Sequence, residues 1–364
     1  MTTPEDAPAG PQPPGERSGR IVVHEHGGPE VLEWELGPLP EPGPGEVRIR
    51  VEAACANFTD VLVRRGLYPS ARKTPVTPGY DFVGRIEALG EGVEGWRVGD
   101  RVADLLVVGG YSEHLVRRAD DLVRVPEAAD AGQAAALVLT WTTAYQLLHR
   151  AGTVAPGMKI LIHAAGGAVG RAMLDLLAGL DGQVQVYGTA REHHHDFLRS
   201  RGATPIDYTV RDWKEQADAL LPGGFDLVYD SVGTGGYRKS WRSLRPGGKL
   251  VAFGFTDKAQ TGRGSLAANF LRLFLWRLLP NRRRATFYAI SNRGKRKRRA
   301  YTEDLTTLLA MLEQGAIQPA IADRLPLRQA AAAHRRIERG GLRGKLVLEG
   351  SASTDDRGRS PSKP

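Results

Sequence analysis

The chain has 364 residues, of which 50 are Lys or Arg and 41 are Asp or Glu, so its formal net charge is +9. This length predicts two domains that each bury a core, and 41% hydrophobic with 25% charged residues excludes a fibrous or wholly disordered chain. The single cysteine, Cys55, excludes an intramolecular disulfide and any site built from two or more thiolates, and it favours a reducing compartment.

The two ends of the chain are predicted to be disordered tails. Residues 1–20 are rich in Pro, Gly and Ala and contain no apolar run, which argues against a signal peptide. Residues 351–364 are again polar. No stretch reaches the roughly 20 apolar residues of a membrane span, and the nearest, Leu266–Leu279, is interrupted by Arg272 and Arg277. A soluble, cytoplasmic protein is therefore expected.

Two patterns divide the part between the tails. From Ile21 to about Val125, short β-branched runs alternate with Gly and Pro turns, which predicts a mostly β half. From about Gln133, Ala- and Leu-rich helical segments alternate with short apolar runs, which predicts βαβ units and a parallel sheet. The runs expected to be strands are Val47–Val51, Arg101–Val108, Lys159–His163, Gln183–Tyr187, Asp226–Tyr229 and Lys249–Phe253.

A further helix is predicted over Thr302–Gln314. Thr302 is a suitable N-cap, and Glu303 and Asp304 suit the positive end of the helix dipole. After this helix, Ala320–Leu325 and Gly344–Leu348 are predicted to be strands that return to the first, β-rich domain.

The segment Lys159–Gly170 carries the most informative motif. An apolar strand leads into a turn of small residues and then an Ala- and Leu-rich helix, which is the context of a dinucleotide-binding G-x-G-x-x-G motif. We predict that the turn binds a pyrophosphate at the helix N-terminus, with a simple tight turn as the alternative. The turn consists of Ala165, Gly166, Gly167, Ala168, Val169 and Gly170, with Ala165 in place of the first glycine.

The residues after the next strand bear on the choice between NAD and NADP. An acidic side chain there binds the ribose hydroxyls of NAD, whereas a basic one accepts the extra phosphate of NADP. Thr189 is followed by Arg191 with no acid at the strand end, although Glu192 stands next to it. We therefore expect NADPH, with Tyr208 as a possible further contact.

These segments together resemble the medium-chain dehydrogenase/reductase superfamily, specifically its zinc-independent quinone oxidoreductase branch. The resemblance covers about Ile21 to Glu349. It rests on Ala56–Asp60, Arg65–Pro69, Pro78–Gly84, Gly99–Val102, Gly109–Glu113, Thr143–Tyr145, the glycine turn and Gly344–Leu348. It implies an α/β fold class: a GroES-like, β-rich catalytic domain over 21–140, completed by 316–350, and a Rossmann domain with a doubly wound parallel sheet over 141–315. The active site is then expected in the cleft between them.

The same resemblance implies that the chain binds no metal. Zinc-dependent members hold the catalytic metal with a Cys, a His and a further Cys or Asp. The corresponding positions here are Asn57, Tyr80 and approximately Leu139. None of these is a thiolate or an imidazole, and one cysteine cannot form a four-Cys structural site.

Without zinc, alcohol oxidation lacks its Lewis acid. The expected reaction is hydride transfer from NADPH to a quinone or an α,β-unsaturated carbonyl, with hydrogen-bond donors stabilising the developing enolate or phenolate. By resemblance, Asn57 lies near the nicotinamide and orients its carboxamide or the acceptor oxygen. Tyr68 and Tyr80 are candidate proton donors. A structural loop role for Asn57 and a place in the pocket wall for the tyrosines are the alternatives.

The remaining cofactor contacts are expected from the Rossmann half. By resemblance, Thr143 lies near the nicotinamide ribose. Val232, Phe253, Gly254 and Phe255 follow the later strands, where open α/β sheets bind their ligands. Core packing is the alternative for Val232 and Phe253.

Leu266–Leu279 is apolar almost all round and is followed by a basic segment. Nine Lys or Arg residues and no acid lie between Arg282 and Arg299, which equals the whole net charge, and a solvated basic loop is the simplest interpretation. An apolar helix must be covered by the substrate cleft, a second subunit or a membrane surface. By resemblance, this stretch lies near the substrate pocket and the subunit interface, which implies a homodimer or a lipophilic carbonyl or quinone substrate. Peripheral membrane contact through 266–299 is an alternative, and there is little reason to expect a nucleic-acid partner. The rival function is an NADPH-binding membrane or partner adaptor with little turnover.

Overall fold

The computed structural model describes residues 16–179, 183–254, 266–276, 278–279, 282–291 and 294–350. Most of the two predicted tails, 1–15 and 351–364, lies outside the described residues. The first tail is nevertheless shorter than predicted, because strand β1 (Arg17–Val22) pairs antiparallel with β2 (Glu33–Pro38). Gly19 of β1 lies directly under the ring of Trp34, so this part of the chain is packed.

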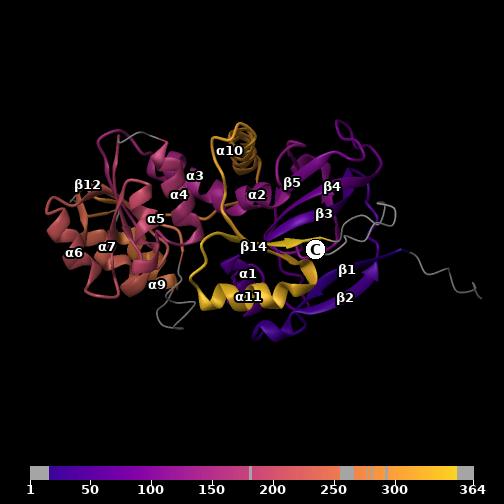
Figure 1. The fold of residues 1–364 in the computed structure, drawn as a ribbon, viewed down its shortest axis with the longest axis horizontal. Coiled ribbons are helices and arrows are strands. Elements are labelled where there is room, and N and C mark those ends of the chain that lie inside the picture. The colour runs from indigo at the N-terminus through magenta and orange to yellow at the C-terminus, as the bar shows by residue number, and fades with distance from the viewer. Residues whose placement is uncertain are drawn as a thin grey trace, which may run out of the picture.

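The β-rich part of the molecule is built around a seven-stranded sheet (Figure 1). Its strands in spatial order are β14 (Ile321–Pro326), β15 (Lys345–Glu349), β3 (Glu46–Ala56), β4 (Asp81–Leu89), β5 (Arg101–Leu105) and β7 (Val123–Arg124), and β6 (His114–Arg118) pairs with β3. The end of the chain thus returns to the first sheet. In the β15–β3 pair, Leu346 faces Ala56 and Val347 faces Cys55.

The second sheet has six strands, and every neighbouring pair is parallel. Its strands in spatial order are β10 (Ala203–Ile206), β9 (Gln185–Thr189), β8 (Lys159–Ile162), β11 (Phe225–Asp230), β12 (Leu244–Ala252) and β13 (Arg284–Phe287). Ile160 and Ile162 pack in one hydrophobic cluster and Leu161 in another, so both faces of the sheet are buried. The predicted fold class, a GroES-like β-rich domain with a Rossmann-type parallel sheet, is confirmed.

Ten α-helices accompany the sheets in the described part of the chain (Figure 1). They are α1 (Phe58–Arg64), α2 (Ala131–Ala136), α3 (Thr142–Gln146), α4 (Ala168–Ala178), α5 (His195–Ser200), α6 (Trp213–Leu220), α7 (Arg238–Arg242), α9 (Leu266–Trp276), α10 (Lys295–Glu313) and α11 (Ala330–Arg339). A π-helical stretch, 137–141, joins α2 to α3, and a second one, 147–152, continues α3, so that one long helical segment links the two sheets. Such irregularities are frequent at functional sites, and Leu139, Thr140 and Thr143 of this segment line the cavity described below.

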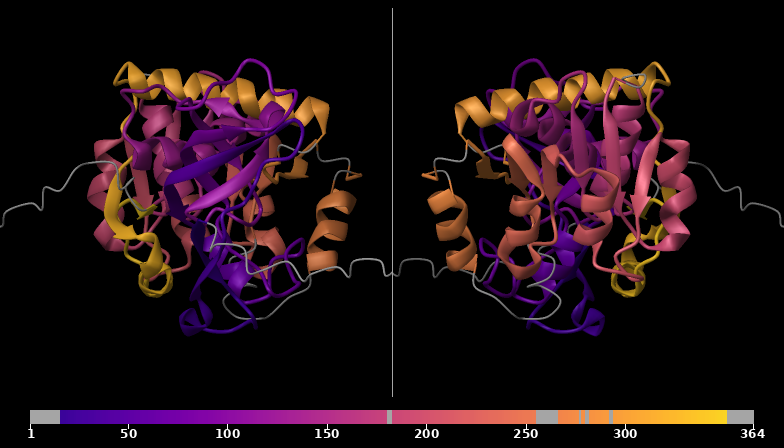
Figure 2. Two further views of the ribbon diagram at one scale, coloured as in Figure 1. Left: turned by 90° about the vertical axis from the view of Figure 1, so that its right-hand side faces the viewer. Right: turned by 90° about the vertical axis from the view of Figure 1, so that its left-hand side faces the viewer.

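The helix predicted to begin at Thr302 begins seven residues earlier, at Lys295. Five of the nine basic residues interpreted as a solvated loop, those of Lys295–Arg299, therefore form its first turns, in part because Lys and Arg favour helix. Arg284 instead begins strand β13. Packing extends the helix as well. Tyr301 is fully buried and donates to the carbonyl of Val138, and Arg298 forms ion pairs with Asp104 and Asp121. Helix α10 consequently lies along one side of the molecule, between its two halves (Figures 1 and 2).

Candidate active site and cofactor cleft

A cavity of about 390 Å³ lies between the two sheets and is lined by residues of both. Its size is typical of a small-ligand site. It brings together ten of the residues that the sequence singled out. These are Asn57, Tyr68, Tyr80, Thr143, Gly167, Ala168, Val169, Gly170, Phe253 and Gly254.

The glycine turn closes the cavity on the side of the parallel sheet. Gly167 is the N-cap of α4, and a Cβ added at Gly170 would lie 2.6 Å from both the carbonyl oxygen of Ala164 and the Cα of Ala165. The helix therefore packs on its turn as closely as a glycine allows. Its free backbone N–H groups and its dipole suit a pyrophosphate.

Ala165, Gly166 and Thr189 support this turn from behind and do not line the cavity. The backbone N–H of Ala165 donates to the carbonyl of Thr189 (3.0 Å), and the Thr189 hydroxyl accepts from the N–H of Ala164 (3.1 Å). A Cβ at Gly166 would lie 2.3 Å from the ring of His194. These three residues fix the shape of the turn.

Three further predicted cofactor residues lie outside the cavity lining. Arg191 is exposed just after β9, and Tyr208 is 45% exposed just after β10. The backbone N–H of Val232 donates to Asp230 (2.8 Å), which shapes the loop after β11. Phe255 lies outside the described residues.

His194 is a candidate that the sequence reasoning missed, because a run of three histidines gave no sign of which one lies against the glycine turn. Partial burial, together with neighbouring positive charges, lowers its pKa to about 4. Those charges belong to His193, Arg171, Arg343 and Arg191. In the described part of the chain, the buried Nδ1 of His194 has no hydrogen-bond partner. Basic side chains thus gather beside the glycine turn, where they attract an anion.

Asn57 stands between β3 and α1 at the opposite wall of the cavity. Its side-chain amide donates to Asp81 Oδ2 (2.9 Å) and to the carbonyl of Cys55 (3.0 Å), which uses both amide hydrogens. Its Oδ1 accepts a hydrogen bond from Lys345 Nζ (2.5 Å). The orientation of this amide is therefore fixed by the protein.

Lys345 is the second residue that the sequence reasoning missed. It is 7% exposed, it lines the cavity, and its Nζ also donates to the carbonyl of Ala56 (3.3 Å). The sequence did hold a signal: a lysine opens the otherwise apolar strand segment Gly344–Leu348. A charged residue at the start of a buried strand is uncommon unless it has a partner.

Two fully buried carboxyl groups lie beneath Asn57. Burial, together with the negative charge of the neighbouring Asp81, raises the pKa of Asp60 to about 7. Burial also raises the pKa of Asp81 to about 6, while the positive charge of Lys345 opposes that rise. Asp60 accepts from the backbone N–H of Asn57 (2.9 Å) and from that of Gly79 (3.2 Å), so it also holds the loop.

A chain of buried hydrogen bonds continues from Asp60 toward the surface. Tyr111 donates its hydroxyl to Asp60 Oδ2 (3.2 Å) and contacts Nε2 of His334 (3.2 Å). Arg64 donates to Nδ1 of His334 (3.4 Å), so Nε2 carries the ring proton and donates to Tyr111. Arg64 also pairs with Glu338 (2.5 Å). The loop that carries Asn57 is therefore tied to α11 by polar contacts.

Tyr68 and Tyr80 form a pair in the cavity wall. Their hydroxyl oxygens are 2.8 Å apart, and their rings meet edge to face with centroids 5.8 Å apart. Tyr80 is 3% exposed. The sequence named both tyrosines, but only the structure shows that their hydroxyls act together.

The residues at the expected zinc position do not fit zinc. Asn57 and Tyr80 offer an amide and a phenol, both engaged with protein groups, and Leu139 offers no ligand atom. The thiol of Cys55 is fully buried, and burial raises its pKa well above the usual range. This donor set lacks the thiolates and imidazoles that zinc requires.

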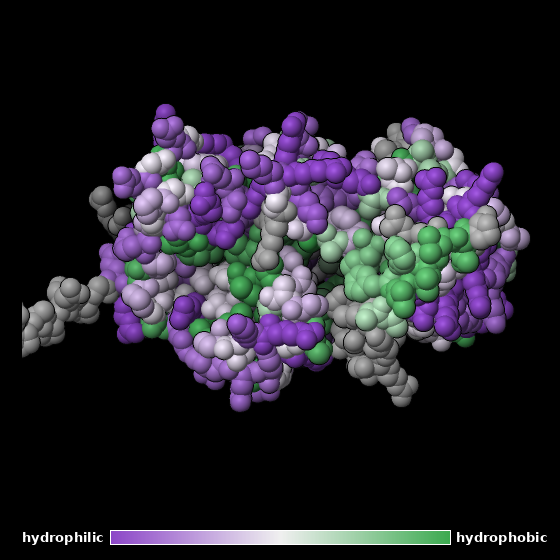
Figure 3. Space-filling model, turned by 180° about the vertical axis from the view of Figure 1, so that it is seen from behind, coloured by the Kyte–Doolittle hydropathy of each residue, from purple (hydrophilic) through white to green (hydrophobic). Residues whose placement is uncertain are grey.

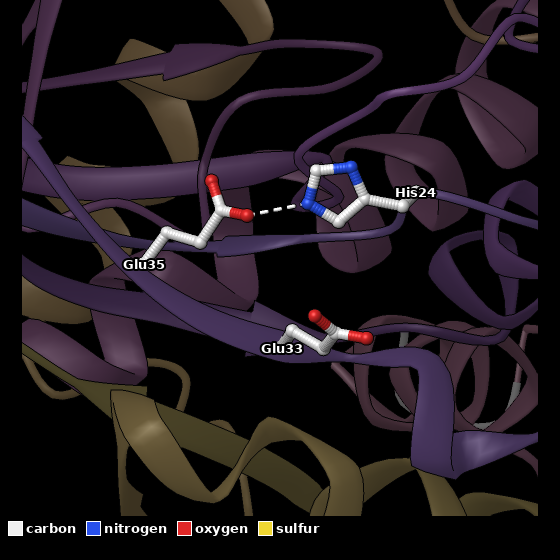
Figure 4. Close-up of side chains that lie close together, drawn as sticks. All are labelled: His24, Glu33 and Glu35. Atoms are coloured by element: carbon white, nitrogen blue, oxygen red, sulfur yellow. Dashed lines mark hydrogen bonds and ion pairs between the residues drawn. The ribbon is translucent and has the colours of Figure 1, made fainter.

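Among the described residues, one group of potential metal ligands converges elsewhere, at His24, Glu33 and Glu35 (Figure 4). It lies at β2 on the surface of the β-rich part. His24 is hydrogen-bonded to Glu35, which raises the pKa of the imidazole, and no bond joins either residue to Glu33. An exposed ion pair of this kind explains the group without a metal.

Comparison with known proteins agrees with this geometry. Residues 43–127 match the alcohol dehydrogenase GroES-like domain, and residues 201–348 match a family model described as zinc-binding dehydrogenase. The synaptic vesicle membrane protein VAT-1 homolog of Rattus norvegicus is 33% identical over 90% of this chain and 83% of its own. A 2-haloacrylate reductase of a Burkholderia species is 32% identical over 90% of this chain and 97% of its own.

Solved structures extend the likeness to the whole fold. The quinone oxidoreductase of Pseudomonas syringae pv. tomato DC3000 matches with a TM-score of 0.79 and 30% identity over 91% of this chain and 99% of its own. A mycobacterial protein solved as a complex with NADPH matches with a TM-score of 0.77 and 29% identity over the same shares.

Fold and site together define an oxidoreductase of two domains that uses a nicotinamide cofactor. The chain belongs to the medium-chain dehydrogenase/reductase superfamily, in its zinc-independent quinone oxidoreductase branch, as its motifs predict. None of the described helices is both long and apolar enough to cross a membrane.

Proposed function

We propose that this protein is an NADPH-dependent reductase that transfers hydride to a quinone or an α,β-unsaturated carbonyl compound. The observation that carries this proposal is the composition of the cavity. A dinucleotide-type glycine turn and a wall of hydrogen-bonding side chains share it, at a position whose donors do not fit zinc. The names of two relatives, a quinone oxidoreductase and a 2-haloacrylate reductase, support the same class of acceptor.

Different residues of the cavity are expected to bind the cofactor and the acceptor. NADPH, when bound, supplies the hydride. The glycine turn at the N-terminus of α4 holds the pyrophosphate, and Thr143 with Phe253 and Gly254 lines the path toward the nicotinamide. The hydroxyl pair of Tyr68 and Tyr80 offers a hydrogen bond to the oxygen of the acceptor, and the fixed amide of Asn57 defines the wall beside it.

The preference for NADPH rests on the charges around the glycine turn. Arg191 stands at the position where a basic side chain accepts the 2′-phosphate of NADP. Arg171 and Arg343 add positive charge near the half-buried ring of His194. A relative of the same fold has been solved as an NADPH complex, which supports the same choice.

The test is to measure consumption of NADPH and NADH by the purified protein with an ortho-quinone, a para-quinone and a linear enone. Turnover of at least one acceptor, with kcat/KM at least tenfold higher for NADPH than for NADH, is expected. Binding of NADPH without turnover of any acceptor would overturn the proposal in favour of an adaptor.

We propose as a second role that α9 docks on an anionic membrane surface. Leu273 of this helix is buried, and Trp276 stacks on Trp241 with centroids 4.8 Å apart. The outer side chains form an apolar patch (Figure 3). It consists of Phe270, Leu271, Phe274, Leu275, Leu278 and Leu279, which are 44% to 69% exposed.

Charge favours a lipid surface over a second copy of the chain at this patch. A cavity of about 420 Å³ beside α9 is lined by Arg238, Trp241, Arg242, Arg272, Trp276 and Arg283. Two copies that meet face to face here would bring their arginines together, whereas anionic headgroups would neutralise them. A relative named as a synaptic vesicle membrane protein supports this role.

Flotation with vesicles of phosphatidylcholine, alone or mixed with phosphatidylserine, tests the second role. The protein is expected to float only with the mixed vesicles, and Leu275→Glu is expected to abolish flotation. Leu220→Glu on α6 is the matched control, because Leu220 is 48% exposed and Leu275 is 49% exposed. A homodimer that Leu275→Glu dissociates, without any flotation of the parent protein, would instead assign the patch to the predicted subunit interface.

A further inference from the structure

The backbone of Lys345 is held in place by hydrogen bonds at the start of β15. Its N–H donates to the carbonyl of Ala320 (2.8 Å), and the strand pairs with both β14 and β3. A Cβ at the preceding Gly344 would lie 2.5 Å from the oxygen of Ala320, so the two segments pass as closely as a glycine permits. The side chain is therefore directed to Asn57 with little freedom.

The ammonium group of Lys345 has one more donor than its protein partners use. Lysine carries three N–H donors. Within the described residues, two of them are accounted for by Asn57 Oδ1 (2.5 Å) and the carbonyl of Ala56 (3.3 Å). Since the side chain lines the cavity and is only 7% exposed, the third hydrogen is available to a molecule bound there.

Two buried carboxyl groups lie near the ammonium group of Lys345. Asp81 binds the far side of the Asn57 amide, so the amide connects a carboxylate to the ammonium group through two hydrogen bonds. The charge of Lys345 acts on both Asp81 and Asp60, and it favours the ionised form of each carboxyl group.

We propose that Lys345 binds the oxygen of the acceptor and protonates it after hydride transfer, and that Asn57 is the positioning residue that holds the ammonium group. This inference rests on the proposed reductase function. It differs from the sequence prediction, in which Tyr68 and Tyr80 are the candidate proton donors. Asn57 has no amide hydrogen left for a ligand, so its part is to fix Lys345.

The reduction consists of a hydride transfer followed by a proton transfer from Lys345, and the cofactor and water supply all that it consumes. Hydride forms a new C–H bond at the conjugated carbon of the acceptor, and the displaced electron pair moves to the oxygen. The Nζ–H bond of Lys345 then breaks as an O–H bond forms, and the neutral amine regains a proton from water. The acceptor has gained two electrons and two hydrogens, of which one comes as hydride from the cofactor and one as a proton from Lys345. A positive charge next to a developing oxyanion favours this step.

Lys345→Met tests this role, because methionine has similar length and no charge. NADPH affinity, followed by the fluorescence of the bound cofactor, is expected to stay within threefold, whereas kcat/KM with the acceptor falls by about a hundredfold. Lys249→Met is the control for the substitution itself, because Lys249 lies in β12 and its Nζ binds the carbonyl of Ala151. Loss of NADPH binding in Lys345→Met, or unchanged kcat/KM, would overturn the proposal.

A second readout needs neither cofactor nor turnover. The chromophore 4-nitrophenol changes its absorbance on ionisation, so it reports the charge at the acceptor oxygen. Its pKa is expected to fall on binding to the parent protein and to rise by about one unit or more in Lys345→Met, which is the loss of one charged hydrogen bond. This titration separates the two proposals: a protein that reduces no acceptor but lowers the pKa of the phenol retains the Lys345 site without the reductase function.

Chemical rescue keeps the test decisive if Lys345→Met fails to fold. Lys345→Cys can be alkylated with 2-bromoethylamine, which restores an ammonium group at nearly the length of lysine. The native Cys55 is fully buried, so the reagent modifies the new thiol selectively. Recovery of at least a tenth of the parent turnover and of the phenol pKa shift is expected. No recovery in a folded, fully modified protein would contradict a role for the charge.

Discussion

Arg298 of α10 and Asp104 of β5 form an ion pair whose Nη1 and Oδ1 atoms are 3.1 Å apart, although 194 residues separate them in the chain. Asp104 is fully buried, and burial raises its pKa, while Arg117 and Arg298 oppose that rise. One residue of the basic segment thus forms a structural ion pair that fastens α10 to the β-rich sheet. The segment cannot be treated as one free charged surface.

Replacement of Arg298 is therefore expected to destabilise the fold. Arg298→Gln removes a cationic partner from the buried carboxylate of Asp104, which should lower the free energy of unfolding by about 1–3 kcal/mol. Chemical denaturation measures this difference. Lys297→Gln, one residue away and exposed, should change it by less than about 0.5 kcal/mol. Equal effects of the two substitutions would contradict this role of the ion pair.

The close packing at the glycine turn predicts that Gly170→Ala abolishes cofactor binding. The new methyl group would meet backbone atoms of Ala164 and Ala165 at 2.6 Å, so the turn must move away from the pyrophosphate position. NADPH affinity, measured by fluorescence titration, is expected to fall by at least about a hundredfold, which equals ~2.7 kcal/mol. Gly179→Ala at the other end of α4 is the control, since its Cβ would have no neighbour nearer than 3.5 Å, and it should bind NADPH normally.

The position of Arg191 predicts a change of cofactor preference. Arg191→Glu places a negative charge where the 2′-phosphate of NADP is expected, so NADPH affinity should fall about tenfold to a hundredfold while NADH affinity is kept or improved. Parallel titrations with both cofactors measure the ratio. Arg118→Glu, at an exposed position at the end of β6 in the other sheet, should leave the ratio unchanged. An unchanged ratio in Arg191→Glu would assign the phosphate site to other cations near His194.

His334 predicts a specific pH dependence of stability. Burial lowers its pKa to about 3, with a further contribution from Arg64. The unfolded chain binds a proton at this histidine as the pH falls below about 6.5, whereas the folded protein does not until about pH 3, so stability is lost in that window. At pH 5 the loss should be about 2 kcal/mol.

The comparison that isolates this effect is with His334→Gln, whose amide can accept from Arg64 and donate to Tyr111. Denaturation midpoints of both proteins are measured from pH 7.5 to pH 5. The raised pKa values of Asp60 and Asp81 act in the opposite direction, because the folded state holds their protons more tightly, and they affect both proteins alike. The parent should therefore lose more stability than the variant on acidification. A steeper loss in the variant would show that His334 is not the group that resists protonation.

The sequence predicts the fold well because the relevant signals are local. Alternation of apolar runs with turns marks the strands, and the strand–turn–helix pattern around Gly170 marks the dinucleotide site within a few residues. The same local rules failed at α10, because a good N-cap at Thr302 was outweighed by the burial of Tyr301 and the ion pairs of Arg298.

Lys345 illustrates what local rules cannot supply. Nothing near it in the chain indicates that it meets Asn57, 288 residues earlier, because that contact depends on the register of β15 against β3. The chain of buried hydrogen bonds from Asp60 through Tyr111 to His334 likewise joins three distant segments.

The sequence by itself determined the class of this protein: residue types at fixed spacing give the glycine turn, the lack of zinc ligands and the order of strands and helices. Only the tertiary structure decided which charges are buried, which pair and which face the cavity. The physical reason is that burial and pairing depend on long-range packing, and these two factors set whether a side chain such as Lys345 acts as a surface charge or as part of a site.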